Sequence, residues 1–210
     1  MDTDPESTER RRRAAVAGHT GDAAAARALL GDPSPAVRAT ALGALARLQQ
    51  LTFEELDDAA GDVAAEVRRR AATEAARFSA GADNSGDRVA LLLRLLADAD
   101  PLVAETAAWA LGESDEPPST EAIERLSATA TTHDDALVRE AAVAALGAIG
   151  DPRGLPAILT ATTDKPAVRR RAVLALAPFE GEDVATALRR ALRDRDWQVR
   201  QAAEDLLAED

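Results

Sequence analysis

The apolar positions of the chain recur at fixed offsets from a valine that opens each of six helical runs. The valines stand 30 to 36 residues apart, an alanine follows each of them after four residues, and a leucine follows five of the six after eight. Offsets of 0, 4 and 8 lie on one face of an α-helix, so the pattern predicts six helices with a narrow apolar stripe. Alanine in the middle of the stripe would allow another helix to approach closely. The six valines are Val37, Val67, Val103, Val138, Val168 and Val199.

Turn signals stand before each valine, and a shorter helical stretch precedes each turn. Aspartate lies five residues before the valine in four repeats, and proline occurs in several of the turns, which is typical of a helix stop followed by a capped start. Residues 6–18 form a further amphipathic stretch that could cap the first repeat, and strand signals are almost absent. The first helices of the six pairs are expected at residues 22–30, 53–60, 88–97, 121–130, 155–161 and 183–192.

These observations predict an all-α protein, an α-α superhelix of about six helix–turn–helix repeats with an N-terminal capping helix. We expect a single domain over residues 1–210, with the cap at 1–20 and the repeats at 21–210. Longer links at 79–87 and 113–120 would act as modest hinges, because loops of this length do not by themselves divide a solenoid.

The motif carries a family resemblance. The run that begins Val138-Arg139 and continues through Ala-Leu-Gly to an Asp-Pro turn resembles the HEAT repeat, and more narrowly the short HEAT-like repeats of phycobilin lyases. It covers roughly residues 20–208, and the second repeat departs most, with Glu74 and Ala75 where the others have alanine and mostly leucine. The resemblance implies a HEAT-like solenoid whose second helices line the concave face. It implies no particular activity.

Charge and composition sharpen this expectation. The chain has 37 acidic and 25 basic residues, a formal charge of −12, and 51 alanines against 43 Leu, Ile, Val and Phe together. Such a composition borders on disorder, but the regular offsets favour thin, closely stacked helices. The acids are evenly spread and Lys165 is the sole lysine, which resembles haloarchaeal, salt-adapted proteins. We therefore expect an acidic, halophilic protein whose stability rises with salt.

The residue inventory limits the possible chemistry. The chain has no cysteine, and its two histidines, His19 and His133, lie four repeats apart. We therefore expect no catalytic residues, no metal site and no cofactor, and we expect that the protein is more plausibly a binding protein than an enzyme. No apolar run is long enough to cross a bilayer and the N-terminus does not resemble a signal peptide, so a cytoplasmic location without membrane partners is predicted.

Arginines offer two interpretations. The arginine that follows most of the valines could form an anion-binding ladder, but a structural pairing with a turn aspartate of its own or the next repeat is favoured, because a residue common to all units serves their stacking. The groups 10–13, 68–70 and 169–171 could bind nucleic acid, which the net negative charge makes a weaker alternative.

Trp109 is the most prominent candidate for binding, in a chain with 2% aromatic residues. It lies six residues after Val103, beside the apolar stripe, whereas Trp197 is expected to pack at a helix start. If the Trp109 side faces the concavity, an aromatic and arginines among small residues would form a partner-binding patch. The predicted patch is Arg70, Thr73, Thr106, Trp109, Ala141, Arg171 and Leu174.

The sequence thus predicts a non-enzymatic scaffold that holds a protein partner, of unknown identity, on the concave face. One alternative is an accessory or lyase-like factor that acts on a chromophore, cofactor or modified protein, which would need a defined pocket near Trp109. The weaker alternative is nucleic-acid binding.

Overall fold

The fold is described from a computed structural model, which covers residues 4–78, 85–114 and 117–208. All regular structure within these ranges is helical, as predicted, and none of them contains a strand. The chain divides into two compact units, Met1–Val103 (unit 1) and Ala104–Asp210 (unit 2). The predicted hinge links fall partly on residues 79–84 and 115–116, outside the described ranges.

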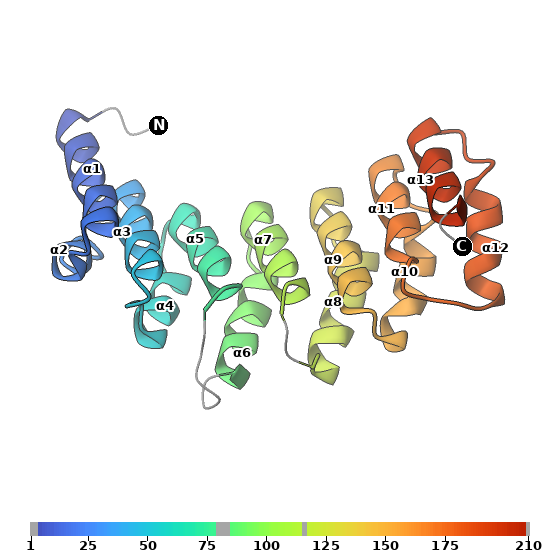
Figure 1. The fold of residues 1–210 in the computed structure, drawn as a ribbon, viewed down its shortest axis with the longest axis horizontal. Coiled ribbons are helices and arrows are strands. Elements are labelled where there is room, and N and C mark those ends of the chain that lie inside the picture. The colour runs from blue at the N-terminus through green and yellow to red at the C-terminus, as the bar shows by residue number, and fades with distance from the viewer. Residues whose placement is uncertain (1–3, 79–84, 115–116, 209–210) are drawn as a thin grey trace. The chain divides into compact units, whose positions relative to one another are not determined.

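Unit 1 is a stack of helical hairpins. The longer second helices α3 and α5 pack side by side, and α1 continues their layer as the predicted cap (Figure 1). The first helices form the other layer, in which α4 contacts α6. The helices are α1 (Pro5–Thr20), α2 (Ala23–Arg27), α3 (Pro35–Arg47), α4 (Phe53–Ala60), α5 (Ala65–Ala75) and α6 (Ser85–Leu96).

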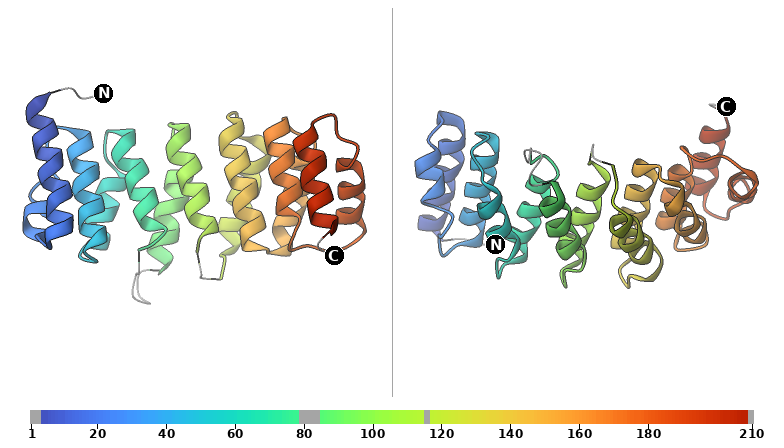
Figure 2. Two further views of the ribbon diagram at one scale, coloured as in Figure 1. Left: turned by 45° about the horizontal axis from the view of Figure 1, so that its top comes forward. Right: turned by 90° about the horizontal axis from the view of Figure 1, so that it is seen from below.

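Unit 2 repeats the same two-layer arrangement. The second helices α9, α11 and α13 lie side by side, and the first helices α8, α10 and α12 contact one another in turn behind them (Figure 2). Helix α7 begins in the last residues of unit 1 and continues into unit 2. The bounds are α7 (Pro101–Gly112), α8 (Thr120–Thr132), α9 (Ala136–Ile149), the short 3₁₀ helix η1 (Pro152–Gly154), α10 (Leu155–Ala161), α11 (Pro166–Ala175), α12 (Glu182–Ala191) and α13 (Trp197–Ala208).

Local capping explains where the helices begin. Thr52 and Glu55 form a reciprocal capping box at the start of α4, and the Ser119 hydroxyl accepts the amide of Ala122 at the start of α8. The predicted ranges 53–60 and 155–161 match α4 and α10 to the residue. Helix α2 is shorter than the predicted 22–30, because the amides of Leu29 and Leu30 bond to carbonyls three residues earlier and tighten the chain into turns.

The predicted apolar stripe is the core of each unit. All six valines and all six alanines four residues later are buried. Leu45, Leu111, Leu146 and Leu176 are buried too, as expected for the stripe position eight residues after the valine. Leu207, the equivalent residue of α13, is 41% exposed, because no further helix among the described residues covers that side.

Glycines mark the places where second helices come closest. A Cβ on Gly112 would lie 2.8 Å from Ala145 Cα, and one on Gly147 would lie 2.7 Å from Ala175 Cα. A Cβ on Gly18 of α1 would meet Ala44 Cα of α3 at 2.9 Å. Real Cβ atoms do not approach other atoms this closely, so these helices cross backbone to backbone.

Candidate partner-binding surface

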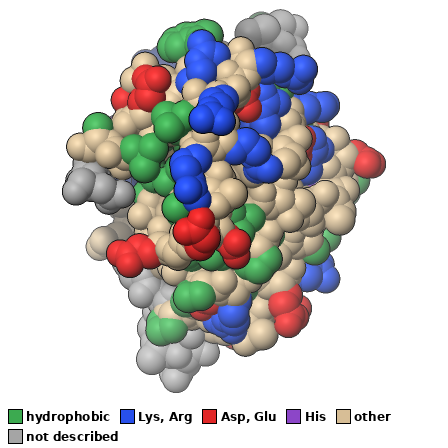
Figure 3. All heavy atoms as spheres, turned by 90° about the vertical axis from the view of Figure 1, so that its right-hand side faces the viewer, with side chains coloured by type: hydrophobic (Ala, Val, Ile, Leu, Met, Phe, Trp, Pro, Cys, Tyr) green, Lys and Arg blue, Asp and Glu red, His purple; other side chains and the backbone are tan. Residues whose placement is uncertain are grey.

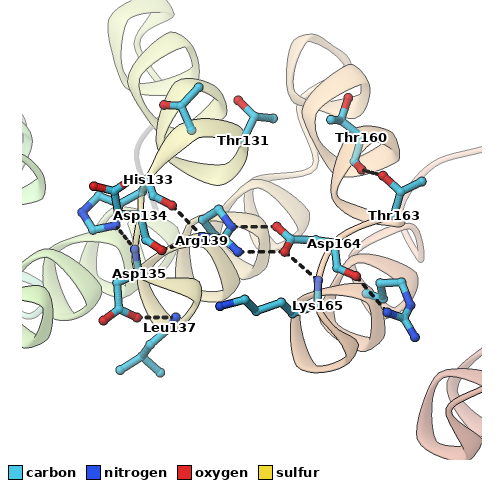
Figure 4. A network of polar contacts seen from close by, with 12 residues as sticks. Thr131, His133, Asp134, Asp135, Leu137, Arg139, Thr160, Thr163, Asp164 and Lys165 are labelled. Atoms are coloured by element: carbon cyan, nitrogen blue, oxygen red, sulfur yellow. Dashed lines mark hydrogen bonds and ion pairs between the residues drawn. The ribbon is translucent and has the colours of Figure 1, made fainter.

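An arginine ties each of several turns to the turn of the next repeat. Arg139 of α9 donates from Nη1 to the carbonyls of His133 (2.6 Å) and Asp134 (3.0 Å), just before its own helix (Figure 4). Its Nε and Nη2 donate to the carboxylate of Asp164 at 2.6 and 2.7 Å. The planar guanidinium therefore bridges two successive turns with a bidentate pair, the strongest geometry that arginine offers a carboxylate.

This arrangement recurs in both units, and we call it the arginine ladder. Each of its arginines stands directly after a stripe valine, and each aspartate stands in the turn of the following repeat. Arg10 of α1 makes a similar contact with Asp32 at 2.8 Å. The four pairs are Arg38–Asp62, Arg68–Asp98, Arg139–Asp164 and Arg169–Asp194.

The ladder lowers the pKa of three of its aspartates. Hydrogen bonds from Arg68, Arg139 and Arg169 lower the pKa of Asp98, Asp164 and Asp194, respectively. Burial opposes this effect, because it disfavours the charged carboxylate, but the hydrogen bonds outweigh it. The geometry agrees with the structural interpretation of the repeated arginine, since each guanidinium is occupied by protein acceptors.

In one place both members of the arginine–aspartate pair are replaced by other residues. Ala104 stands after Val103 where other repeats have arginine, and His133 stands in the next turn where most repeats have aspartate. His133 Nδ1 accepts the amide of Asp135 at 3.1 Å, the same local bond that Asp98 makes with the amide of Asp100. Histidine thus preserves the turn without placing a carboxylate where no guanidinium would neutralise it.

Trp109 lies in a groove of about 430 Å³ on the second-helix surface of unit 2. The half-buried indole on α7 faces small side chains of α9, Ala141 and Ala144, and the more exposed Ala148. Arg171 of α11 reaches the groove, with its Nε 3.5 Å from Glu140 Oε1. We call this site the Trp109 groove; its remaining lining residues are Glu105, Gly112, Glu113, Leu137 and Ala145.

The predicted patch is brought together only in part. Trp109, Ala141 and Arg171 line the Trp109 groove. Thr106 bonds to Glu105 instead and does not line the groove, because it lies one turn earlier and to the side, and Leu174 is exposed outside it. Arg70 and Thr73 lie in unit 1, where they line a different cavity. That the two groups form one patch stays a prediction.

The predicted patch omits the acidic residues of the groove. Glu105 and Glu113 stand four residues before and four residues after Trp109, and Glu140 approaches from α9. Positions four apart share a helix face, so the sequence contains the signal for the first two. The pairing of Glu140 with Arg171 joins neighbouring repeats and has no signal in the sequence of either helix alone.

The C-terminal end of unit 2 is locally basic although the chain is acidic. Residues 165–200 contain nine basic and five acidic side chains. Figure 3 shows Lys and Arg side chains gathered over part of this end. Trp197 begins α13, as expected, but it is 64% exposed, which corrects the expectation that it packs against the previous turn. A cavity of about 400 Å³ at this end is lined by Arg169, Arg190, Arg193 and Arg195 among others.

The described residues contain neither a metal-binding cluster nor a membrane-spanning helix. No group of three or more His, Asp or Glu side chains among them could hold a metal ion. In the same ranges, none of the helices combines the length and the apolar character that crossing a membrane requires.

The stacked helical hairpins, paired in two layers, place the chain in the class of α-solenoids. Residues 88–165 and 123–208 match the family described as HEAT repeats, and residues 25–51 match the HEAT repeat. The first two matches together span more than half of the chain. The chain therefore belongs to the HEAT repeat family.

Solved structures share this fold at low sequence identity. YibA of Escherichia coli is 17% identical with a TM-score of 0.69, over 99% of this chain and 76% of that one. An engineered protein is 21% identical with a TM-score of 0.61, over 89% and 95%. A designed armadillo repeat protein in complex with the peptide (KR)4 is 18% identical with a TM-score of 0.55, over 95% and 97%. Among curated proteins, none matches this sequence.

Proposed function

We propose that this HEAT repeat protein is a non-enzymatic scaffold and that it binds a protein partner in the Trp109 groove. The observation that carries the proposal is the groove itself, in which an aromatic side chain faces the small residues of the neighbouring second helix. The location of the groove on the second helices supports the proposal, because second helices are expected to line the concave, ligand-binding face of repeat proteins of this kind.

The chemistry of the groove suits a protein segment. Ala141 and Ala144 leave space beside the indole of Trp109, so an inserted side chain would remove apolar surface from water on both sides. Tryptophan and arginine in a concave, partly desolvated site are the residues that most often dominate binding energy. Trp109 and Arg171 both meet this description.

The charges of the groove favour a basic segment. Glu105 and Glu113 flank Trp109, whereas Glu140 is paired with Arg171. A Lys or Arg side chain laid over the indole would contact the electron-rich ring face and two carboxylates at once. The designed armadillo repeat protein with its (KR)4 peptide gives a precedent for a basic peptide on a related fold, although the likeness is one of fold alone.

The two tryptophans provide a matched test. A tagged chain would capture partners from a lysate of the source organism in molar KCl, and the Trp109→Ala and Trp197→Ala variants would be compared with it. We expect that Trp109→Ala loses the specific partner and that Trp197→Ala retains it. Equal recovery by both variants would exclude the Trp109 groove as the site.

A second function uses the same groove. Its volume lies within the range of small-molecule sites, which favours an accessory or lyase-like role on a chromophore, cofactor or modified protein as the alternative. Protein purified from its own host would then release a small molecule detectable by absorbance or mass spectrometry. A scaffold would release none and would retain its protein partner.

A further inference from the structure

A cavity of about 780 Å³ opens on the surface formed by α1, α3 and α5 of unit 1. Arg47, Arg70 and Arg77 contribute side chains to its lining, and Leu51 and Phe78 add apolar surface. We call this site the arginine cavity. Its volume falls in the range of sites that hold small organic ligands. It belongs to unit 1 and is independent of the Trp109 groove.

The three arginines of the cavity surround a single carboxylate. Arg70 Nη1 lies 3.2 Å from Glu74 Oε1, and the Glu74 side chain is 14% exposed. Burial raises the pKa of Glu74, and the nearby charges of Arg70, Arg77 and Arg47 offset only part of that effect. The cavity therefore has more positive than negative charge, and its only carboxylate is itself destabilised by burial.

Glu74 is also a departure from the repeat pattern. It stands seven residues after Val67, at the position that alanine occupies in four other repeats. Gly43 of α3 faces the pair: a Cβ there would lie 3.3 Å from Arg70 Cζ and 3.4 Å from Glu74 Oε1. Alanine at position 74 would serve the stacking of α3 and α5 as it does elsewhere, so packing does not explain the glutamate.

Arg47 and Arg77 differ from most other arginines of unit 1. Both are exposed, and within the described ranges neither has a carboxylate at ion-pairing distance. In a chain with 37 acidic and 25 basic residues, carboxylates are in excess, so two unpaired guanidinium groups beside one cavity are available to an external anion. The arginines of unit 1 that are paired elsewhere include Arg10, Arg27, Arg38, Arg68 and Arg94.

We propose that the arginine cavity binds an organic anion. Its carboxylate or phosphate group lies between Arg47 and Arg77, within reach of Arg70, and its apolar part lies against Leu51 and Phe78. Guanidinium groups match both kinds of anion through paired N–H donors. This activity goes beyond partner binding at the Trp109 groove and does not depend on it.

The same residues give the site a pH dependence. Glu74 competes with the ligand for Arg70, and protonation of Glu74 releases that arginine. His19 of α1 also lines the cavity. The other charged groups that act on Glu74 are Arg47, Arg70 and Arg77. Binding of the anion therefore strengthens as the pH falls.

Calorimetric titration with phenyl phosphate and with benzoate tests the proposal, with benzamide as the uncharged control. We expect saturable binding of at least one anion and none of benzamide. The Arg47→Ala and Arg77→Ala variants should each weaken binding about tenfold, the loss of one charge-assisted hydrogen bond. Arg69→Ala is the matched control, because Arg69 is exposed on the same helix as Arg70 but does not line the cavity.

Glu74→Gln provides a readout that surface charge alone would not give. It should tighten binding at pH 7 and reduce the gain on acidification, because it removes the competing carboxylate. Binding of phenyl phosphate only would identify a phosphate ester as the ligand class, and binding of benzoate only a carboxylate. Three results would overturn the proposal. The protein could bind neither phenyl phosphate nor benzoate, Arg69→Ala could weaken anion binding as much as Arg77→Ala does, or Glu74→Gln could bind the anion more weakly than the unchanged protein. Circular dichroism of each variant, with Arg77→Gln as a milder substitution, verifies that the helices are intact.

Discussion

At the scale of residues, the recurring arginine has a structural task that its position in the sequence already indicates. Arg38 and Arg139 each join the carbonyls of one turn to the aspartate of the next. The direction of the pairing, toward the following repeat, depends on how the hairpins stack and is not contained in the spacing alone. A single side chain thereby satisfies backbone acceptors and fixes the neighbouring repeat.

Removing one rung tests this role. Arg139→Ala should lower the free energy of unfolding by about 2 kcal/mol, because Asp164 and two turn carbonyls lose a partly buried donor. Chemical denaturation would measure the change, and a double-mutant cycle with Asp164→Ala would isolate the pair. Arg125→Ala, an exposed position on α8, should change the stability by less than about 0.5 kcal/mol. Equal effects of Arg139→Ala and Arg125→Ala would refute the structural role.

The lowered pKa values of Asp98, Asp164 and Asp194 make the stability of the fold depend on pH in the acid range. A carboxylate with a lowered folded-state pKa stabilises the fold above its unfolded pKa of about 3.9 and loses that contribution as the pH falls through the folded value. Stability should therefore decline below about pH 4, and Arg139→Ala should decline less steeply. The raised pKa of Glu74 has the opposite effect on stability, because its buried carboxylate destabilises the fold when charged and protonation removes that penalty. Parallel pH profiles for the two proteins would contradict the assignment.

At the scale of elements, the helix pairs were predictable because the offsets of valine, alanine and leucine define one buried face. The closest contacts were less predictable: Gly112 and Gly147 follow the stripe leucine directly, yet their role depends on the neighbouring helix approaching at Ala145 and Ala175. The candidate site, too, could be predicted from the sequence only in part. Trp109 and its flanking glutamates share a helix, whereas the contribution of α9 and α11 depends on packing.

The glycine crossings give a prediction at this scale. Gly147→Ala should destabilise the protein by about 1–3 kcal/mol, because the new Cβ would lie 2.6 Å from Ala175 Cβ and the backbones must move apart. Gly31→Ala is the control, since nothing lies within 4 Å of a Cβ there. Urea denaturation of the two variants would compare them. A Gly147→Ala variant as stable as Gly31→Ala would show that the helices are not in backbone contact.

At the scale of the whole molecule, the charge of −12 favours stability in salt. Self-repulsion of the evenly spread carboxylates destabilises the folded chain in dilute buffer, and the screening length falls to about 3 Å at 1 M salt. The melting temperature should therefore rise from dilute buffer to molar KCl. Sucrose at matched osmolality would control for solute exclusion. A melting temperature indifferent to KCl would contradict the prediction.

The central claim is that a protein partner occupies the Trp109 groove, and the absence of cysteine from the chain allows it to be tested directly. The Ala148→Cys variant would carry a photo-crosslinker at the groove, and Ala185→Cys would carry the same group at an exposed position of α12 outside it. Illumination in a lysate of the source organism, followed by mass spectrometry, should give one defined partner adduct from position 148 and none from position 185. Adducts of equal yield and identity from both positions would contradict the claim.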